Sequence, residues 1–174
     1  PKIEFVLIDA IGREWQCGTL QVDFNLPGRL DASYVANNGS KQVPVMLHRA
    51  MFGSLERFIG ILIEHHAGKF PFWLAPDQVA VLPISSEQND YAFKLKMLLE
   101  KKGLRSIIDN RNEKINYKIR EHSVSKIPVL MICGAKEVQN QTITIRRFGL
   151  EQQQTMSLDE AMDKLSLESR TPSI

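Results

Sequence analysis

The stretch VPVMLHRAMFGSLERFIGIL, residues 43–62, changes from a strand pattern to a helix pattern within a few residues. A short apolar run opens it and predicts a β-strand, and Gly53-Ser54 then form a turn of small residues. Ser54 can cap the helix that follows, and Arg57 falls in the first turn of that helix. Because a helix start favours bound anions, the stretch places cationic and metal-capable side chains beside an anion site.

The helix that begins after this turn is predicted to run to about His66. Its apolar residues recur at the i, i+3, i+4 spacing of a face that packs on a core. They are Leu55, Phe58, Ile59, Leu62 and Ile63. The same pattern leaves Arg57 on a different face of the helix.

Two strands are predicted upstream, over residues 3–9 and 15–24, with a turn at 11–14 between them. Polar and apolar residues alternate in the second strand, and Gln16 falls on its apolar face. The residues on the other face are Cys17, Thr19, Gln21 and Asp23. A strand with one polar face indicates that this face lines a site and not a core.

The second half of the chain follows a segment at 67–76 that carries a glycine, two prolines and three aromatic residues. No helix is expected to cross it, so we place a domain boundary near residue 75. Strand and helix patterns then alternate, which favours an α/β domain with a mixed or mostly parallel sheet. The predicted strands are 78–83, 104–109, 128–133 and 141–147, and the predicted helices are 87–102, 113–122 and 158–167.

The composition excludes several classes of protein. The net charge is only +2, too small by itself to indicate nucleic-acid binding. Cys17 and Cys133 lie far apart without a C-x-x-C motif, which favours a reducing, cytoplasmic compartment over a disulfide framework. The longest apolar run is far shorter than the roughly 20 residues of a membrane helix, so no membrane partner is expected. Pro1 follows neither a methionine nor a signal peptide, and we expect it to be an internal cut in a longer protein.

A charged cluster stands out in the second half, at 110–122. It contains four basic and two acidic residues. Lys114 and Lys118 repel each other slightly at i, i+4 spacing, and an anionic partner would offset that repulsion. The alternative is the solvated face of an ordinary helix, and the pattern alone leaves both open.

These segments resemble the class II aminoacyl-tRNA synthetases, and the threonyl family in particular. The run from His48 to Arg57 resembles the third signature motif of the class. The sequence WQCGT at 15–19, combined with His48, points to the threonyl family. The resemblance covers nearly the whole chain, but the first two class motifs and the editing domain of the family have no counterpart in it.

The resemblance implies an α/β (α+β) fold with two domains. Residues 1–75 would be the C-terminal part of a class II catalytic domain, an antiparallel sheet with the third-motif helix. Residues 76–174 would be an α/β anticodon-binding domain with a five-stranded mixed sheet.

The resemblance also implies roles for four residues of the first domain. Arg57 would lie against the adenine and terminal phosphates of ATP, with Ser54 near the adenosine. Lys2 and Gln21 would point into the site that holds threonine and its adenylate. Each has an ordinary alternative, since Arg57 can be a solvated helix residue, Ser54 a helix cap and the other two polar strand residues.

His48 corresponds to one of three zinc ligands in the threonyl family. The other two, a cysteine and a histidine, would lie upstream of Pro1, so zinc is not expected in this chain. The alternative is a structural histidine at a strand end, because one histidine alone is weak support for a metal site. In the family, zinc binds the amino group and hydroxyl of threonine, and Mg²⁺ accompanies ATP.

The charged cluster resembles the anticodon-reading region that the threonyl, prolyl, histidyl and glycyl enzymes share. The positions that carry over are Asn112, Arg120, Glu137 and Arg146. Asparagine, glutamate and arginine can each hydrogen-bond the edge of a base, and arginine also binds phosphate.

The resemblance therefore implies a threonine–tRNA ligase as the parent protein, a cytoplasmic homodimer that uses ATP, threonine and tRNA-Thr. This chain is expected to keep anticodon binding without full catalysis. The alternative is a non-catalytic RNA-binding paralogue that uses only the anticodon-binding domain.

Overall fold

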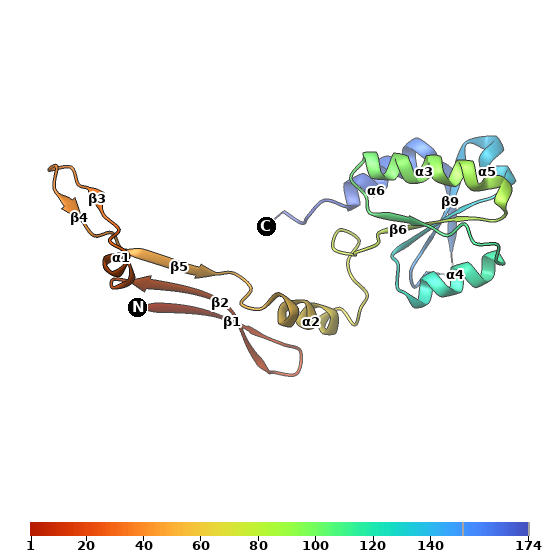
Figure 1. Cartoon of the computed structure of the whole chain (residues 1–174). Coiled ribbons are helices and arrows are strands. Elements are labelled where there is room, and N and C mark those ends of the chain that lie inside the picture. Colours follow the sequence, from red (N-terminus) through yellow and green to blue (C-terminus); the bar gives the residue numbers. More distant parts are fainter. Residues whose placement is uncertain (151, 174) are drawn as a thin grey trace. The chain divides into compact units, whose positions relative to one another are not determined.

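The computed structural model describes residues 1–150 and 152–173, and the chain divides into two compact units (Figure 1). The first unit is Pro1–His66 and the second is Ala67–Ile174. None of the helices in the described part of the chain is long and apolar enough to span a membrane.

The segment 67–76, predicted as a linker, is grouped with the second unit. The guanidinium of Arg105 holds it there, because Nη2 donates to the carbonyl oxygens of Trp73 at 2.9 Å and Ala75 at 2.8 Å. The second unit therefore begins before the boundary near residue 75 that the sequence suggests.

The first unit is built on an antiparallel sheet with the strand order β1-β2-β5, followed by one helix. Ser54 caps that helix through a hydrogen bond from the amide of Arg57. The elements are β1 (Lys2–Ile8), β2 (Glu14–Asp23), α1 (Leu26–Arg29), β3 (Tyr34–Val35), β4 (Lys41–Gln42), β5 (Met46–Ala50) and α2 (Leu55–His65).

A β-bulge at Cys17 interrupts the predicted alternation of β2. Phe5 pairs with Gly18 but the next residue of β1 pairs with Gln16, so Cys17 is the extra residue. The prediction for Gln16 was wrong, because its Nε2 donates to Glu4 Oε1 at 3.1 Å across the polar face. Cys17 is buried and does not belong to a regular polar row.

The bulge also receives the turn that leads into α2. Gly53 has a φ of +66°, and a Cβ at this position would lie 3.3 Å from the carbonyl oxygen of Cys17. A side chain would therefore strain the backbone and crowd β2. This explains the glycine at the centre of the strand–turn–helix stretch.

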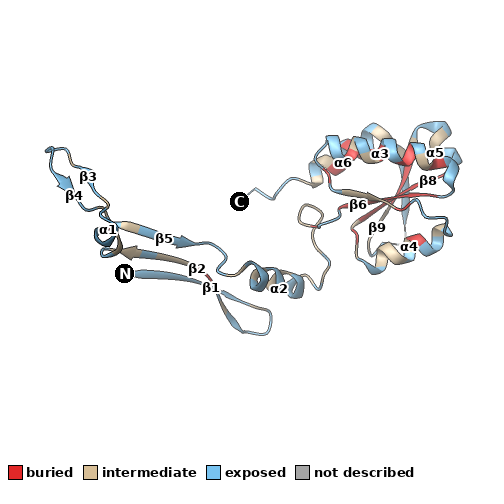
Figure 2. Cartoon of the chain, viewed as in Figure 1, coloured by how far each residue is buried: buried red, intermediate tan, exposed pale blue. Residues whose placement is uncertain are grey.

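The first unit has no hydrophobic core of its own. Within residues 1–66, all of which are described, only Cys17, Gly18 and Pro27 are buried. All seven residues of β1 are exposed, with 59% of Phe5 accessible to solvent, and α2 buries no residue (Figure 2). The apolar helix face predicted from the i, i+3, i+4 pattern is thus only partly covered: Phe58 and Leu62 are half-buried, whereas Leu55, Ile59 and Ile63 are exposed.

The second unit contains a five-stranded mixed sheet with the order β10-β9-β8-β6-β7, which confirms the predicted fold class. β6 runs parallel to β7 and β8, whereas β9 pairs antiparallel with both β8 and β10. The strands are β6 (Val79–Pro83), β7 (Ser106–Ile108), β8 (Val129–Cys133), β9 (Thr142–Arg147) and β10 (Gln153–Ser157).

Helices cover the two faces of this sheet unequally. On one face α3 and α6 enclose the larger core, which includes Leu95, Ile145 and Leu165, all nearly inaccessible to solvent. On the other face α4 encloses a small cluster around Leu82 and Leu130 (Figure 1). The helices of the unit are η1 (Ser86–Gln88), α3 (Asn89–Lys101), α4 (Ile115–Val124), α5 (Ala135–Asn140) and α6 (Leu158–Glu168).

The difference in burial predicts that the two units differ in stability. Produced separately, residues 67–174 should unfold in one cooperative thermal transition, because they bury a continuous core. Residues 1–66 should give no such transition, since they bury almost no apolar surface. Circular dichroism melting measures both, and a sharp transition from the isolated 1–66 segment would contradict the prediction.

Candidate functional site

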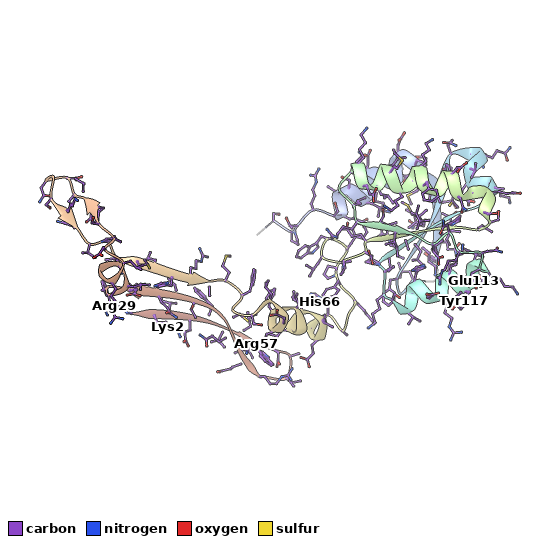
Figure 3. All side chains as sticks on the ribbon, in the orientation of Figure 1. Lys2, Arg29, Arg57, His66, Glu113 and Tyr117 are labelled. Atoms are coloured by element: carbon purple, nitrogen blue, oxygen red, sulfur yellow. The ribbon has the colours of Figure 1, made fainter. Side chains whose placement is uncertain are left out.

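Three of the predicted site residues form one row across the sheet of the first unit. Gln21 in β2 pairs with Lys2 in β1 on one side and with His48 in β5 on the other. Figure 3 labels Lys2, at the start of β1. Directly opposed residues of antiparallel strands project from the same face of the sheet. The three side chains therefore share a face, although they come from positions far apart in the sequence.

A hollow on this face is lined by Gln21 and His48 together with Thr19 and Asp23. His48 Nε2 lies 3.2 Å from Asp23 Oδ2. The pKa of Asp23 is lowered, chiefly because the backbone amides of Leu26 and Asn25 donate to its carboxylate, with His48 adding to the effect. The hollow thus combines an amide, an imidazole and an ionised carboxylate.

These residues do not by themselves make a zinc site. In residues 1–150 and 152–173 no three histidine, cysteine or acidic side chains gather closely enough to hold a metal ion. A protein zinc site uses at least three protein ligands, and here His48 has only Asp23 beside it. Cys17 is buried and does not line the hollow.

Arg57 and Ser54 lie on the turn and first helical residues after β5, and neither lines that hollow. Ser54 Oγ donates to Glu56 Oε2 at 2.9 Å and accepts from the Arg57 amide at 3.3 Å. Its single proton is therefore used within the cap. The guanidinium of Arg57 is exposed and makes no hydrogen bond to the rest of the described chain.

The face of the sheet that α4 covers becomes polar at β9 and β10, where Arg146 and Gln153 form a polar strip. One row of paired residues crosses this face: Ala80 in β6, Leu130 in β8, Arg146 in β9 and Gln153 in β10. The apolar end of the row packs with α4, whereas Gln153 is exposed. The face therefore changes from core to open polar surface at β9.

A hollow of about 510 Å³ lies where this strip meets α4. Arg120 and Arg146 both line it, together with Asn116, Ser123 and Gln153. None of its described lining residues is acidic, and neither arginine has an ion-pair partner within the described chain. By contrast, Arg147 on the next position of β9 is paired with a glutamate of α6 at 2.8 Å. The hollow is therefore a site of positive charge that suits an anion.

Glu137 belongs to the same face but its carboxylate is already engaged. Oε2 accepts from the amide of Gly134 at 2.9 Å, and Oε1 accepts from Thr144 Oγ1 at 2.9 Å. Burial raises its pKa, but these hydrogen bonds outweigh that effect and the pKa is lowered. Because the Thr144 hydroxyl donates its one proton to Glu137, the Thr155 hydroxyl donates to Thr144 Oγ1, which lies 2.8 Å from Thr155 Oγ1.

Asn112 lies in the loop before α4 and does not line the hollow. A buried charge cluster fixes the start of this loop. Asp109, with 3% of its side chain exposed, accepts from Arg111 Nη2 at 2.7 Å and lies 2.9 Å from His122 Nε2. Hydrogen bonds from Arg111, followed by His122, hold the pKa of Asp109 well below its ordinary value.

A buried lysine ties the same loop to the sheet. Lys118 in α4 is almost fully buried, and its ammonium donates to the carbonyl oxygens of Pro83 and Asp109, each at 3.0 Å. Lys114, its predicted repulsive neighbour, is exposed. The charge of Lys118 therefore serves the fold and does not contribute to a surface patch.

The structure brings Arg120 and Arg146 together, places Glu137 on the same sheet face and leaves Asn112 on the neighbouring loop. Sequence reasoning missed Asn116 and Gln153 in the hollow. The sequence signal for Gln153 was weak, since β10 is short and mostly polar and was not predicted as a strand.

Two protein families match the chain. Residues 78–168 match the family described as "Anticodon binding domain". Residues 1–66 match "tRNA synthetase class II core domain (G, H, P, S and T)". The chain belongs to the class II aminoacyl-tRNA synthetases. Within that class it corresponds to the end of the core domain followed by the anticodon-binding domain.

Threonyl enzymes are among the sequences similar to this chain, which confirms the predicted family. The chain is 61% identical to threonine–tRNA ligase of Pelagibacter ubique, over 95% of this chain and 26% of that protein. It is 57% identical to the ligase of Rhodospirillum rubrum, over 100% of this chain and 27% of that protein. The chain thus spans about a quarter of the length of these relatives.

A solved structure of the same class has the same fold. It is described as the RNA binding domain of threonyl-tRNA synthetase from Cryptosporidium parvum Iowa II. The TM-score is 0.86 and the identity 36%, over 99% of this chain and 44% of that one.

Replacing Asp109 by asparagine tests the cluster that fixes the loop of this synthetase domain. His122 would lose its carboxylate partner and Arg111 would keep only its ion pair with Glu121, so we expect the free energy of unfolding to fall by about 3 kcal/mol at neutral pH. Because the folded-state pKa of Asp109 is lowered, its contribution is present above about pH 4 and is lost as the pH falls below that value. The difference in free energy of unfolding between the variant and the wild type should therefore become smaller below about pH 4.

Guanidinium denaturation over a series of pH values measures this difference. The control is Asp163→Asn, because the Asp163 carboxylate, 76% exposed, pairs with Lys102 at the surface and should contribute at most about 1 kcal/mol. If the difference in free energy of unfolding between Asp109→Asn and the wild type stayed constant as the pH fell, the proposed stabilisation by ionised Asp109 would be contradicted.

Proposed function

We propose that this chain is part of a threonine–tRNA ligase and that its second unit binds the anticodon loop of tRNA-Thr. The observation that carries the proposal is the hollow lined by Arg120 and Arg146, in which no described lining residue is acidic. Neither arginine has an ion-pair partner among residues 1–150 and 152–173. Sequence-specific RNA binding uses single-stranded loops, whose splayed bases are hydrogen-bonded on their edges while arginine and lysine hold phosphates. An uncovered polar strip of a sheet beside a helix offers both functions.

Within this proposal the four anticodon residues have different tasks. Arg120 and Arg146 bind phosphate or the acceptor atoms of a base, since a guanidinium has only donors. Glu137 retains free lone pairs and can accept from a base amino group, but it does so from a position fixed by its own capping bonds. Asn112 hydrogen-bonds a base edge from the loop that Asp109 and Lys118 hold in place.

We further propose that the first unit contributes to the adenylation site of the ligase. In that reaction the threonine carboxylate attacks the α-phosphorus of ATP, a carboxylate–phosphorus bond forms, and the bond to the departing pyrophosphate breaks. Arg57 neutralises charge on the terminal phosphates of ATP, which would bind together with Mg²⁺. Ser54 lies near the adenosine. Lys2 and Gln21 orient threonine from the row they share with His48.

His48 would act as one zinc ligand of the ligase. Its Nε2 already faces Asp23, and a metal-bound histidine commonly has a carboxylate on its other ring nitrogen. The remaining ligands would have to come from outside these 174 residues. Bound zinc would supply Lewis-acid contacts to the amino group and hydroxyl of threonine, which discriminates against valine.

The RNA-binding proposal is tested by two neighbouring arginines of β9. Binding of the chain to the anticodon stem-loop of tRNA-Thr is measured by fluorescence anisotropy over a range of salt concentrations. Arg146→Gln should weaken binding about tenfold. If Arg146 contacts a phosphate, the slope of log affinity against log salt should also fall by about 0.7, the value for one single-strand contact.

The matched control is Arg147→Gln, which removes the same charge from the adjacent residue. Arg147 points toward α6, where it pairs with Glu168, so RNA affinity should change less than twofold, roughly the scatter of such assays. Equal losses from both variants would indicate a general charge effect and would count against the proposed site.

The adenylation proposal is tested in the full-length ligase. Arg57→Ala should slow ATP–pyrophosphate exchange by about a hundredfold or more, as removal of a charge-stabilising donor does in other enzymes. Binding to the anticodon stem-loop should stay unchanged. The control Lys41→Ala removes an exposed charge from β4 and should keep the exchange rate, whereas an unaffected Arg57→Ala enzyme would rule out the role.

A further inference from the structure

Gln153 lies on the polar strip because of the register of β10. It pairs directly with Arg146 of β9, and directly opposed residues of an antiparallel pair project from the same face. Gln154, the next residue, pairs with Ile145, whose side chain packs in the core on the opposite face. Two adjacent glutamines therefore face opposite sides of the sheet.

The carboxamide of Gln153 is exposed and uncommitted. It lines the hollow with Arg120 and Arg146, and it makes no hydrogen bond to residues 1–150 or 152–173. Its neighbour on the same face, Thr155, is by contrast already bonded to Thr144 in the relay that ends at Glu137. Gln153 thus presents both an acceptor and a donor to whatever occupies the hollow.

We propose that Gln153 is a specificity-determining residue that reads the edge of one anticodon base. The inference rests on the proposed function of the hollow and adds to it a residue on a strand outside the predicted set. A carboxamide can donate to and accept from a single base edge at once, which arginine cannot do. Opposed side chains lie close enough for Gln153 and Arg146 to contact the same nucleotide, one for identity and one for charge.

This division of labour gives Gln153 a distinct experimental signature. A neutral side chain releases no counterions, so its loss leaves the salt dependence of binding unchanged. Its loss should instead flatten the preference for one base. A residue that merely supported β10 would alter affinity for every loop alike, or the stability of the fold.

The test compares Gln153→Ala with the wild-type 174-residue chain, using the tRNA-Thr anticodon stem-loop and versions with each anticodon base replaced in turn. We expect Gln153→Ala to bind the cognate loop about tenfold more weakly, and to bind loops altered at one anticodon position as the wild type does. The salt slope should match that of the wild type. Gln154→Ala, the matched control, should behave like the wild type with every loop, and thermal melting should be the same for all three proteins.

The possible outcomes separate this inference from the proposed function. If the wild type does not distinguish the loops, the proposed function fails and the inference fails with it. If the wild type distinguishes them and Arg146→Gln weakens binding, but Gln153→Ala keeps full selectivity, the proposed function stands and Gln153 is excluded. A uniform loss over all loops by Gln153→Ala also overturns the inference.

Discussion

On one face of the five-stranded sheet in the second unit, α4 covers one end and leaves the other end open. The strand register places Ala80, Leu130, Arg146 and Gln153 in one row on this face, so the row runs from the covered end to the open end. Where α4 packs, the row is apolar and contributes to a core. Where α4 ends, the same face becomes polar. The hollow lined by Arg120 and Arg146 is therefore a result of this incomplete covering of the sheet.

The position of α4 in turn depends on buried charge. The ammonium of Lys118 binds carbonyl oxygens at the end of β6 and just after β7, and Asp109 binds Arg111 and His122 beside it. A buried ion without such partners would cost several kcal/mol, so these contacts admit few alternative positions for the helix. They also fix both ends of the loop that carries Asn112. The basic residues of the cluster at 110–122 are thus divided: Lys118 and Arg111 make contacts within the fold, whereas Arg120 has no ion-pair partner among the described residues.

The sequence predicted the family, the mixed sheet and the strand–turn–helix stretch well, because these depend on local pattern and on recognisable motifs. It could not predict the bulge at Cys17, since a bulge depends on pairing with β1 and leaves no clear pattern in β2 itself. It also missed α5, which has only six residues, and β10, whose sequence QQTMS lacks apolar alternation. As a result Gln153 was not among the residues predicted from the sequence, whereas Arg146 was predicted through the resemblance and stays a prediction.

The two units differ in how their candidate site residues are held in place. In the second unit the core that supports Arg120, Arg146 and Gln153 is contained within the described residues. In the first unit the row of Lys2, Gln21 and His48 is formed by backbone pairing alone, while apolar residues of β1 and α2 stay exposed. Backbone pairing fixes which residues are neighbours, but packing fixes rotamers to the precision that catalysis requires. The residues of the proposed RNA-binding site are therefore held by packing within the described chain, whereas the residues of the proposed adenylation site are aligned by strand pairing alone.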